Sequence, residues 1–352
     1  MDIEALHYEV LEEKDYDSYE AFVLNHEHGC FMQSKNWAKV KSNWKHEVVV
    51  AKNGQGVICA GMSILIMPMG PGALMYAPRG PVCDYSDKAA ITCILEGAAE
   101  VAKKYHAHIL KMDPYILEDE QAVIDVWVGA GCSFTPHAAF KDTIQPRYNY
   151  MLPYIGGLSE DDLMAKFVRD TRYYIRYPQK KGVICKHGNE LMDDFYKIYS
   201  ETGERQGFSI RPRSYLEGFL NAFPEHARLY MCYFEDKPLC GGIAVNYAGK
   251  TAHVYGCSTD EMRNVRPTYL LQWELMKWAL STGCTIYDMQ GVAIKKEDSE
   301  ALYGVLGFKQ NFTGEIVTTA GEFEVIYRPT VNAALNAALN AAMTARKKMH
   351  SH

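Results

Sequence analysis

The stretch "RNVRPTYLLQWELMKWALSTGCTIYDMQG", residues 263–291, decides the fold. It begins as a loop, continues as a helix whose apolar residues recur at helical spacing, and stops at Gly283. A short strand follows, which we expect to end at Asp288. Trp278 belongs to the apolar stripe of the helix, whereas Trp273 lies off it. A helix that leads into a strand in this way is one half of an α/β unit.

The same order of elements occurs twice in the chain. Residues 46–113 and 228–291 each read as a β-hairpin, a further strand, a loop, a helix and a last strand. Asn53-Gly54 marks the first hairpin turn, residues 235–238 mark the second, and we expect a helix over 88–105. Three landmark pairs recur at nearly one offset: Gly61 and Gly242, Tyr76 and Tyr255, Asp113 and Asp288. The repetition predicts an internal duplication.

This order of elements resembles that of acyl-coenzyme A N-acyltransferases. We therefore expect an α/β (α+β) fold of two tandem GNAT-like (acyl-CoA N-acyltransferase-like) domains. Such folds usually hold pyrophosphate on a glycine-rich loop whose backbone N–H groups point at the anion. The two loops in that place, "YAPRGPVCDYSD" (76–87) and "GCSTDEMRNVRPTY" (256–269), lack the pair of glycines. The sequence thus argues against coenzyme A as the donor, and we expect no cofactor.

Composition excludes several classes of protein. The 352 residues are 48% hydrophobic and 23% charged, which suits a globular protein of two domains or of one large domain with a duplicated core. The net charge of −6 gives no overall basic field, so we expect no DNA partner. Ten cysteines without a CxxC pair indicate no metal site and a reducing cytoplasm rather than a disulfide framework. We find neither a signal peptide nor a run of about 18 apolar residues that would predict a membrane helix.

One dense basic patch stands out in this acidic chain. The stretch "LSEDDLMAKFVRDTRYYIRYPQKKGV" (158–183) opens with a capping box formed by Ser159 and Asp162. Four basic residues then follow at helical spacing, interleaved with tyrosines: Arg169, Arg172, Arg176 and Lys180. Either this is a solvated helix face, or it contacts RNA or phosphate. The tail over residues 332–348 predicts an alanine-rich helix with a basic end.

Seven stretches in consistent order resemble the FemABX family of peptidoglycan bridge aminoacyltransferases. The similarity extends from about residue 30 to about residue 316. The stretches are "FMQSKNWAKVK" (31–41), "YAPRGPV" (76–82), "IQPRYNY" (144–150), "RYYIRYPQKKGV" (172–183), "ERQGFSIRPRSY" (204–215), "YGCSTDEMRNVRPTYLLQWELMKWAL" (255–280) and "GFKQNFTGE" (307–315).

The resemblance implies both an organisation and a reaction. Residues 1–145 with a returning tail, 317–352, would form a first, precursor-binding domain, and residues 146–316 a second. The reaction would transfer Ala, Ser or Gly from aminoacyl-tRNA to the side-chain amine of the third stem-peptide residue of a peptidoglycan precursor. The chain lacks a long heptad stretch, so it resembles the subgroup without a coiled-coil arm. That subgroup favours UDP-MurNAc-pentapeptide as acceptor, with a lipid-linked precursor as the alternative.

The resemblance also implies a set of precursor-binding residues. Six positions match the family's pattern: Lys35, Trp37, Ser209, Arg211, Tyr215 and Tyr255. A lysine together with Arg211 would suit the phosphates of the nucleotide. Arg213 is a nearby competitor for that role, and Tyr255 could equally be a core tyrosine at the end of a strand.

Two further residues are implied in the chemistry itself. The acceptor amine, with a pKa of about 10.4 if it is a lysine, must lose a proton before it attacks the ester. Asp113 matches the aspartate proposed as base, and its alternative role is to orient the amine. Asp288, at the duplicate position, is assigned a structural role. Phe308 and Lys309 match a Phe-Lys pair in which the lysine contacts the tRNA acceptor end or stabilises the tetrahedral intermediate.

Two rival functions stay open from the sequence. One is an N-acyltransferase that uses coenzyme A, against which the missing glycines argue. The other is a non-catalytic paralogue that binds precursor or tRNA without transferring anything. The retention of four family positions argues against loss of activity: Lys35, Arg211, Asp113 and Lys309.

Overall fold

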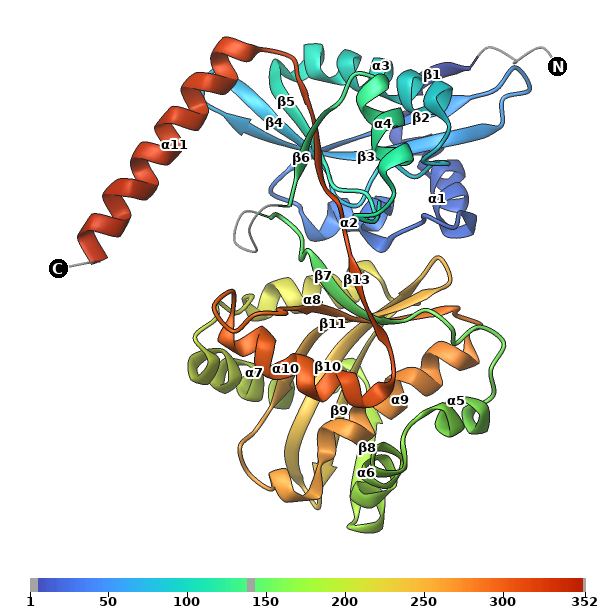
Figure 1. Cartoon of the computed structure of the whole chain (residues 1–352), viewed down its shortest axis with the longest axis vertical. Coiled ribbons are helices and arrows are strands. Elements are labelled where there is room, and N and C mark those ends of the chain that lie inside the picture. The colour runs from blue at the N-terminus through green and yellow to red at the C-terminus, as the bar shows by residue number, and fades with distance from the viewer. Residues whose placement is uncertain (1–5, 138–142, 351–352) are drawn as a thin grey trace. The chain divides into compact units, whose positions relative to one another are not determined.

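The chain forms two compact units in the computed structural model, which describes residues 6–137 and 143–350 (Figure 1). The first unit comprises residues 6–28, 32–137 and 320–350, and the second comprises residues 29–31 and 143–319. The boundaries expected from the sequence, 145 and 316, stay a prediction. The assignment of precursor binding to the first domain stays a prediction.

The first unit is built on a seven-stranded sheet. Its strand order is β1-β2-β3-β4-β5-β14-β6. The strands are β1 (His7–Val10), β2 (Lys45–Lys52), β3 (Ile58–Met69), β4 (Gly72–Ala77), β5 (Ala107–Met112), β14 (Gly321–Ile326) and β6 (Ser133–Pro136). All neighbours are antiparallel except β4 and β5, which run parallel.

Helix α3 supplies most of the helical cover of the first sheet. The helices of this unit are α1 (Tyr16–Asn25), α2 (Lys35–Val40), α3 (Lys88–Tyr105), α4 (Gln121–Gly129) and α11 (Pro329–His350). Helix α3 has the predicted bounds because its ends are encoded locally. The Asp87 carboxylate accepts hydrogen bonds from the backbone N–H groups of Ala89 and Ala90, and His106 ends the helix in the left-handed region, at φ 52°.

The second unit repeats this architecture. Its strand order is β13-β7-β12-β11-β10-β9-β8, and here only β11 and β12 run parallel. The strands are β7 (Tyr148–Leu152), β8 (Val183–His187), β9 (Ala227–Phe234), β10 (Lys237–Tyr247), β11 (Lys250–Ser258), β12 (Ile286–Val292) and β13 (Glu315–Thr318). Both predicted hairpin turns are confirmed, at residues 53–57 and 235–236.

Helix α9, the helix of residues 263–291, is buried on more than one side. The helices of the second unit are α5 (Glu160–Lys166), α6 (Arg169–Lys180), α7 (Met192–Gln206), α8 (Arg213–Ala222), α9 (Pro267–Ser281) and α10 (Glu300–Lys309). Helix α9 packs against the sheet and also against α6. Trp273 is therefore buried as well as Trp278, although it lies off the apolar stripe, and its ring contacts Phe167.

The two sheets exchange one strand each. Strand β7 follows β6 in the chain, yet it lies beside β12 in the second sheet. Strand β14 follows β13, yet it lies beside β5 in the first sheet. Each sheet thus has the same sequence of parallel and antiparallel neighbours, and the predicted internal duplication accounts for this repetition. The exchange itself cannot be read from the order of elements.

One predicted strand end is wrong. Asp113 directly follows the last residue of β5, as expected, but Asp288 is the third residue of β12, which continues to Val292. The two aspartates are therefore not at equivalent positions of the duplicated fold. The strand continues because β12 pairs with β7 on both sides of an irregularity between Asp288 and Gly291.

No helix in the described part of the chain is both long and apolar enough to cross a membrane.

Candidate active site

A cavity opens where the central parallel strands of the second unit part. The β11–β12 register covers Lys250–Ala252 on one strand and Ile286–Asp288 on the other. Further along, β11 pairs with β10 and β12 pairs with β7. A cavity of about 830 Å³ lies at this divergence, lined from α7, β11, α9 and α10. Because ligands of open α/β sheets bind at the carboxyl ends of strands, this is a suitable place for chemistry.

Lys309 carries a buried positive charge on the wall of this cavity. Its side chain is 7% exposed, and its Nζ donates hydrogen bonds to the carbonyl oxygens of Gln290 at 3.0 Å and Gly291 at 2.9 Å. Burial lowers the pKa of Lys309 to about 8, and the nearby Asp288 carboxylate opposes that shift. The ammonium is thus the main form near neutral pH. A fixed cation in a partly enclosed cavity is suited to stabilising a developing oxyanion.

A strained bulge holds the two carbonyl groups that bind Lys309. Gln290 adopts the left-handed region, at φ 64°, which costs a residue other than glycine about 1–3 kcal/mol. The Asp288 carboxylate accepts hydrogen bonds from the Gln290 backbone N–H at 2.7 Å and from its Nε2 at 2.6 Å. Asp288 therefore has a structural role, as predicted, and it acts on the site. No sequence pattern pointed to Gln290.

A second network of buried polar side chains reaches the cavity wall. The Tyr287 hydroxyl donates to Gln272 Oε1 at 2.7 Å, and Gln272 Nε2 lies 3.0 Å from His253 Nδ1. Burial, with a smaller contribution from Lys309, lowers the pKa of His253 to about 4, so the imidazole is neutral. A Cβ on Gly242 would come within 2.5 Å of His253 Nε2. The position of the His253 ring therefore requires glycine at residue 242. This network of hydrogen bonds was not predicted from the sequence.

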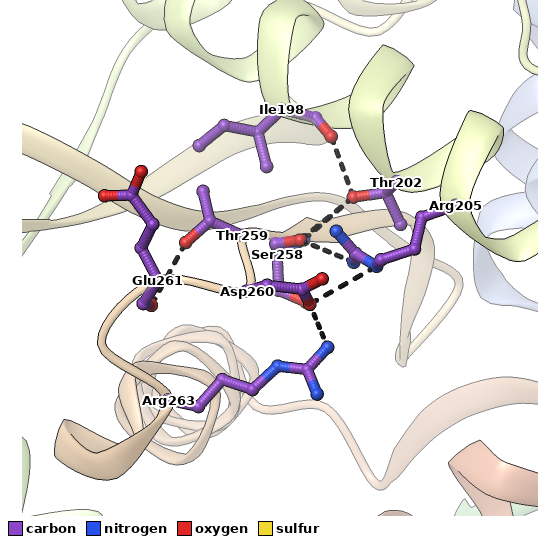
Figure 2. A network of polar contacts seen from close by, with 8 residues as sticks. All are labelled: Ile198, Thr202, Arg205, Ser258, Thr259, Asp260, Glu261 and Arg263. Carbon is purple, nitrogen blue, oxygen red and sulfur yellow. Dashed lines mark hydrogen bonds and ion pairs between the residues drawn. The ribbon is translucent and has the colours of Figure 1, made fainter.

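An arginine network borders the cavity on another side (Figure 2). Arg205 donates from Nη2 to the Ser258 carbonyl at 2.8 Å, and its Nε lies 3.4 Å from Asp260 Oδ1. Arg263 pairs with the same carboxylate. The Thr202 hydroxyl adds a contact to the Ser258 carbonyl at 3.1 Å. These contacts connect the loop after β11 to the end of α7. Two guanidinium groups that line the cavity share a single carboxylate, so this side of the cavity carries an excess of positive charge.

Several predicted precursor-binding residues meet in the second unit. The Arg211 guanidinium lies 5.2 Å from the ring centre of Tyr215, and the ring centres of Tyr215 and Tyr255 are 6.5 Å apart. Phe219 packs edge-on against Tyr255 at 5.9 Å. Burial first, and then Tyr215, raise the pKa of the Tyr255 hydroxyl. Ser209 is exposed on the segment that leads to Arg211. The cluster combines an accessible cation with an ordered aromatic support.

The competing arginine is occupied. Arg213 Nη1 lies 2.5 Å from Asp193 Oδ1, and Arg213 Nε lies 2.7 Å from Glu217 Oε1. Two carboxylates thus compensate its charge. Arg211 is exposed, and no ion pair to it occurs among residues 6–137 and 143–350. The geometry favours Arg211 for binding an anion.

Lys35 and Trp37 lie on α2 of the first unit. Ser34 caps this helix by accepting a hydrogen bond from Asn36 N, and the backbone N–H of Lys35 donates to Glu20 Oε2 at 2.9 Å. The Lys35 ammonium pairs with Asp17, and this hydrogen bond lowers the pKa of the aspartate. The Trp37 side chain is 6% exposed. Trp37 is thus packed in the fold, while Lys35 is held by an exposed acid that a stronger anion could replace.

Asp113 is buried in the first unit with both carboxylate oxygens engaged. Oδ2 accepts from the Tyr76 hydroxyl at 2.6 Å, and Oδ1 accepts from the Arg79 backbone N–H at 2.6 Å. Its side chain is 2% exposed, and burial raises its pKa to about 6. These contacts fit an aspartate that orients its surroundings better than a freely accessible base.

The basic residues of α6 divide into two groups. Arg169, Arg176 and Lys180 are exposed. Arg172 is half-buried, and its Nη1 donates to the carbonyl oxygen of Phe167 at 2.9 Å. The predicted capping box of α5 is present. Arg172 therefore supports the junction of α5 and α6, and the other three are available to a partner.

The described residues contain no group of three His, Cys, Asp or Glu side chains placed to hold a metal ion. All ten cysteines carry free thiols, and most of these side chains are buried.

Comparison with known proteins identifies relatives over nearly the whole chain. The model of the FemAB family matches residues 12–237 and 233–340. The UDP-N-acetylmuramoylpentapeptide-lysine N(6)-alanyltransferase of Weissella viridescens is 29% identical over 327 residues, which cover 91% of this chain and 96% of that protein. The lipid II:glycine glycyltransferase of Staphylococcus haemolyticus is 25% identical over 88% of this chain and 90% of its own length.

A solved structure has the same fold. The crystal structure of FemX superimposes with a TM-score of 0.84 at 24% identity, and the match covers 93% of this chain and 99% of that one. The likeness to solved structures confirms the predicted fold of two tandem GNAT-like domains.

Proposed function

The chain belongs to the FemAB family, and from this premise we propose that it forms an interpeptide bridge of peptidoglycan. It is an aminoacyltransferase, and the proposed reaction moves Ala, Ser or Gly from aminoacyl-tRNA to a precursor. The acceptor is the side-chain amine of the third stem-peptide residue. Relatives named as an alanyltransferase and a glycyltransferase support the class of donor group.

The observation that carries this proposal is Lys309 in the cavity of the second unit. The acceptor amine attacks the ester carbonyl carbon, and a C–N bond forms while the carbonyl oxygen becomes an oxyanion. The Lys309 ammonium, held by the carbonyl oxygens of residues 290 and 291, is suited to stabilising that charge. The C–O bond to the ribose then breaks, and the ribose oxygen takes the proton that the amine loses. Phe308, beside Lys309 on the cavity wall, offers a ring against which a terminal base can pack.

The acceptor is a phosphate-bearing precursor, for which the Arg211 cluster is the proposed site in the second unit. A guanidinium supported by Tyr215 can bind a diphosphate with two parallel hydrogen bonds. Ser209 and Tyr255 are proposed contacts of the same ligand. Lys35 of the first unit is a further proposed phosphate ligand, with Trp37 holding its helix in place. The nucleotide-linked precursor UDP-MurNAc-pentapeptide is the first choice, because the relative with 29% identity is named for a UDP-linked pentapeptide.

Asp113 is proposed to orient the acceptor side rather than to remove its proton. Its two oxygens are already bonded to Tyr76 and to the Arg79 backbone. Because the ester is activated, positioning of two large substrates supplies much of the rate. We place the reaction in the cytoplasm, where charged tRNA and the nucleotide precursor are both present.

A lipid-linked precursor is the second candidate acceptor. The staphylococcal relatives named lipid II:glycine glycyltransferase are 25–26% identical to this chain, close to the value for the alanyltransferase. Both precursors carry a diphosphate, so the Arg211 cluster serves either one.

A transfer assay tests the proposal. Purified protein is mixed with UDP-MurNAc-pentapeptide and a pool of charged tRNAs, and the mass of the precursor is then measured by mass spectrometry. A gain of one amino acid, which disappears in Arg211→Ala and persists in the matched control Arg213→Ala, is the expected result. A gain only with the lipid-linked precursor would change the acceptor. No gain with either precursor would overturn the enzyme proposal in favour of a binding paralogue.

A further inference from the structure

Helix α6 carries a basic face that the reaction described above does not use. Residues 166–181 contain six basic side chains and one acidic side chain, in a chain whose net charge is −6. The buried side of the helix, formed by Thr171, Ile175 and Pro178, is already covered by packing within the second unit. The opposite side faces solvent. We call this side the α6 ridge and define it by Arg169, Tyr173, Arg176, Tyr177 and Lys180.

The cations of the α6 ridge are free to bind an external anion. Arg169, Arg176 and Lys180 are exposed, and none of them forms an ion pair in the described part of the chain. Tyr173 lies between them with 52% of its side chain exposed. An exposed tyrosine flanked by unpaired cations is typical of a surface that binds a polyanion carrying flat rings.

A continuous series of aromatic rings links the ridge to the cavity. Phe308 and Tyr269 line the cavity, and their ring centres are 5.1 Å apart. Tyr269 lies 5.2 Å from Tyr174, and Tyr174 lies 5.7 Å from Tyr173. Tyr173 in turn lies 5.3 Å from Tyr177. The rings thus lead from the wall beside Lys309 to the exposed side of α6.

Positive charges accompany these rings. The Arg266 guanidinium lies 3.7 Å from the ring centre of Tyr174, and Arg266 also lines the cavity. The Lys181 ammonium lies 5.5 Å from the ring centre of Tyr177. Alternation of rings and cations is the arrangement by which proteins follow a single nucleic-acid strand, since bases stack on the rings and phosphates meet the cations.

We propose that the α6 ridge binds the single-stranded 3′ end and the adjoining phosphates of the donor tRNA, so that the terminal ester reaches the cavity. This inference rests on the proposed function for the identity of the RNA. The contacts are to backbone and ring faces, so the ridge would accept different charged tRNAs. Selection of the amino acid then falls to the cavity.

An anionic membrane is the alternative partner for a basic amphipathic helix. Such helices insert large apolar side chains into the lipid. Here Val168, with 56% of its side chain exposed, is the aliphatic residue beside the ridge, and the exposed rings are tyrosines. The ring series also leads into a cavity rather than across a flat apolar face. The observations therefore favour RNA.

Binding of uncharged tRNA tests the ridge directly. The variant combines Arg169→Gln, Arg176→Gln and Lys180→Gln, and the matched control combines Lys88→Gln, Lys103→Gln and Lys197→Gln, which are also exposed. We expect the ridge variant to bind tRNA about 10- to 100-fold more weakly near physiological salt, because about three phosphate contacts are lost. The slope of log affinity against log salt should become shallower by about 2 to 3. The control should match wild type in both.

A second variant separates stacking from charge. Tyr173→Ala removes a ring without removing a cation. We expect it to weaken tRNA binding about tenfold, in line with the loss of one stacked base. The salt slope should stay at the wild-type value, because no phosphate contact changes.

Two donors then connect the ridge to the reaction. One is full-length aminoacyl-tRNA, and the other is the same amino acid esterified to the terminal dinucleotide CpA, which lacks the adjoining phosphates that the ridge is proposed to bind. The ridge variant should lose about 10- to 100-fold in kcat/KM with the tRNA and keep the wild-type value with the dinucleotide. Equal loss with both donors would overturn the inference, because it would mean a structural defect.

Three further results would also decide the question. Wild-type tRNA affinity and salt slope in the ridge variant would overturn the inference. So would loss of binding to phosphatidylglycerol vesicles with tRNA binding unchanged, which would assign the ridge to a membrane. If wild-type protein transfers from neither donor, the proposed function fails, and the tRNA-binding measurement still decides the role of the ridge by itself.

Discussion

The two units share one strand order but end their central parallel strands differently. In the first unit, the β4–β5 register runs to Ala77 and Met112, the last residues of both strands. Asp113 follows at once and is bonded to Tyr76 on the neighbouring strand. In the second unit, the β11–β12 register reaches Ala252 and Asp288, and both strands continue beyond it with other partners.

The difference teaches how the two copies of a duplicated fold can offer different surroundings at the same place in the sheet. Where the register is complete, the strand ends are joined by a buried carboxylate. Where the register stops early, a cavity lies between the strands, with Lys309 on its wall. The same duplication thus supplies one pair of strand ends joined by a buried carboxylate, the closed end, and one pair that borders a cavity, the open end, where we propose that the reaction takes place.

The largest expected effect concerns the closed end in the first unit. Burial raises the pKa of Asp113 from 3.8 to about 6, so the folded protein binds this proton more tightly than the unfolded chain does. The free energy of unfolding should therefore fall as pH rises through the window from 3.8 to 6, by about 3 kcal/mol in all. Asp113→Asn should remove this component. Urea unfolding of wild type and variant at pH 4 and pH 7 measures it.

An equal pH dependence in the two proteins would mean that folding does not raise the pKa of Asp113. The matched control is Asp125→Asn, on the exposed side of α4, which should leave the wild-type pH dependence unchanged.

The next effect concerns the open end in the second unit. In Gly242→Ala, the new Cβ would lie 2.5 Å from His253 Nε2, and Gln272 holds that ring in place. We expect the free energy of unfolding to drop by about 1–3 kcal/mol, the usual effect of overpacking. Thermal denaturation measures the change.

Gly218→Ala is the matched control for that substitution. Gly218 lies inside α8, and a Cβ there would meet no atom within 4 Å. Alanine should therefore stabilise the protein by about 0.5–1 kcal/mol. If Gly242→Ala and Gly218→Ala destabilised the protein to the same degree, the contact between residue 242 and the His253 ring would not be the cause.

The smallest effect is a shift in the pH profile. Asp288 raises the pKa of Lys309, which burial lowers to about 8. In Asp288→Asn, that pKa should fall further, so the charged ammonium should be lost at a lower pH. The alkaline limb of kcat should move down by about one unit, equivalent to about 1.4 kcal/mol. His253, whose pKa burial lowers to about 4, and Glu300 also line the cavity, and both are unchanged in this variant.

Gln290→Gly provides the control for geometry in that experiment. Glycine tolerates the left-handed backbone at position 290 without help from the Asp288 side chain. The double variant Asp288→Asn with Gln290→Gly should keep the shifted profile. Return of the wild-type profile would show that Asp288 acts on Lys309 only through the shape of the bulge.

Local features of the fold could be predicted from the sequence. The capping box at Ser159 and the bounds of α3 are set by side chains within a few residues of the helix ends. The apolar stripe did not predict the burial of Trp273, because one stripe accounts for one buried side, whereas α9 is also covered by α6. The predicted end of β12, at Asp288, was wrong because the strand continues by pairing with β7, which is distant in the sequence.

Residues of the candidate site could be named from the sequence only where a family pattern supplied the positions. Arg211, Tyr215 and Tyr255 were named from that pattern, and they do lie together in the second unit. Gln272 and His253 come from different elements and meet only through packing, so no spacing rule could pair them. Gln290 was missed because its effect on Lys309 comes from backbone conformation rather than from its residue type.

The most direct test of the open end is the single-turnover rate of transfer by Lys309→Met. Methionine keeps the length and apolar character of the lysine stem but removes the charge. With both substrates saturating, we expect the rate to fall by about 10²–10³-fold, while urea unfolding shows a folded protein and the affinities for tRNA and precursor stay within a few fold. A variant that transfers at the wild-type rate would contradict the account, because the cavity of the second unit would then not be where the oxyanion is stabilised.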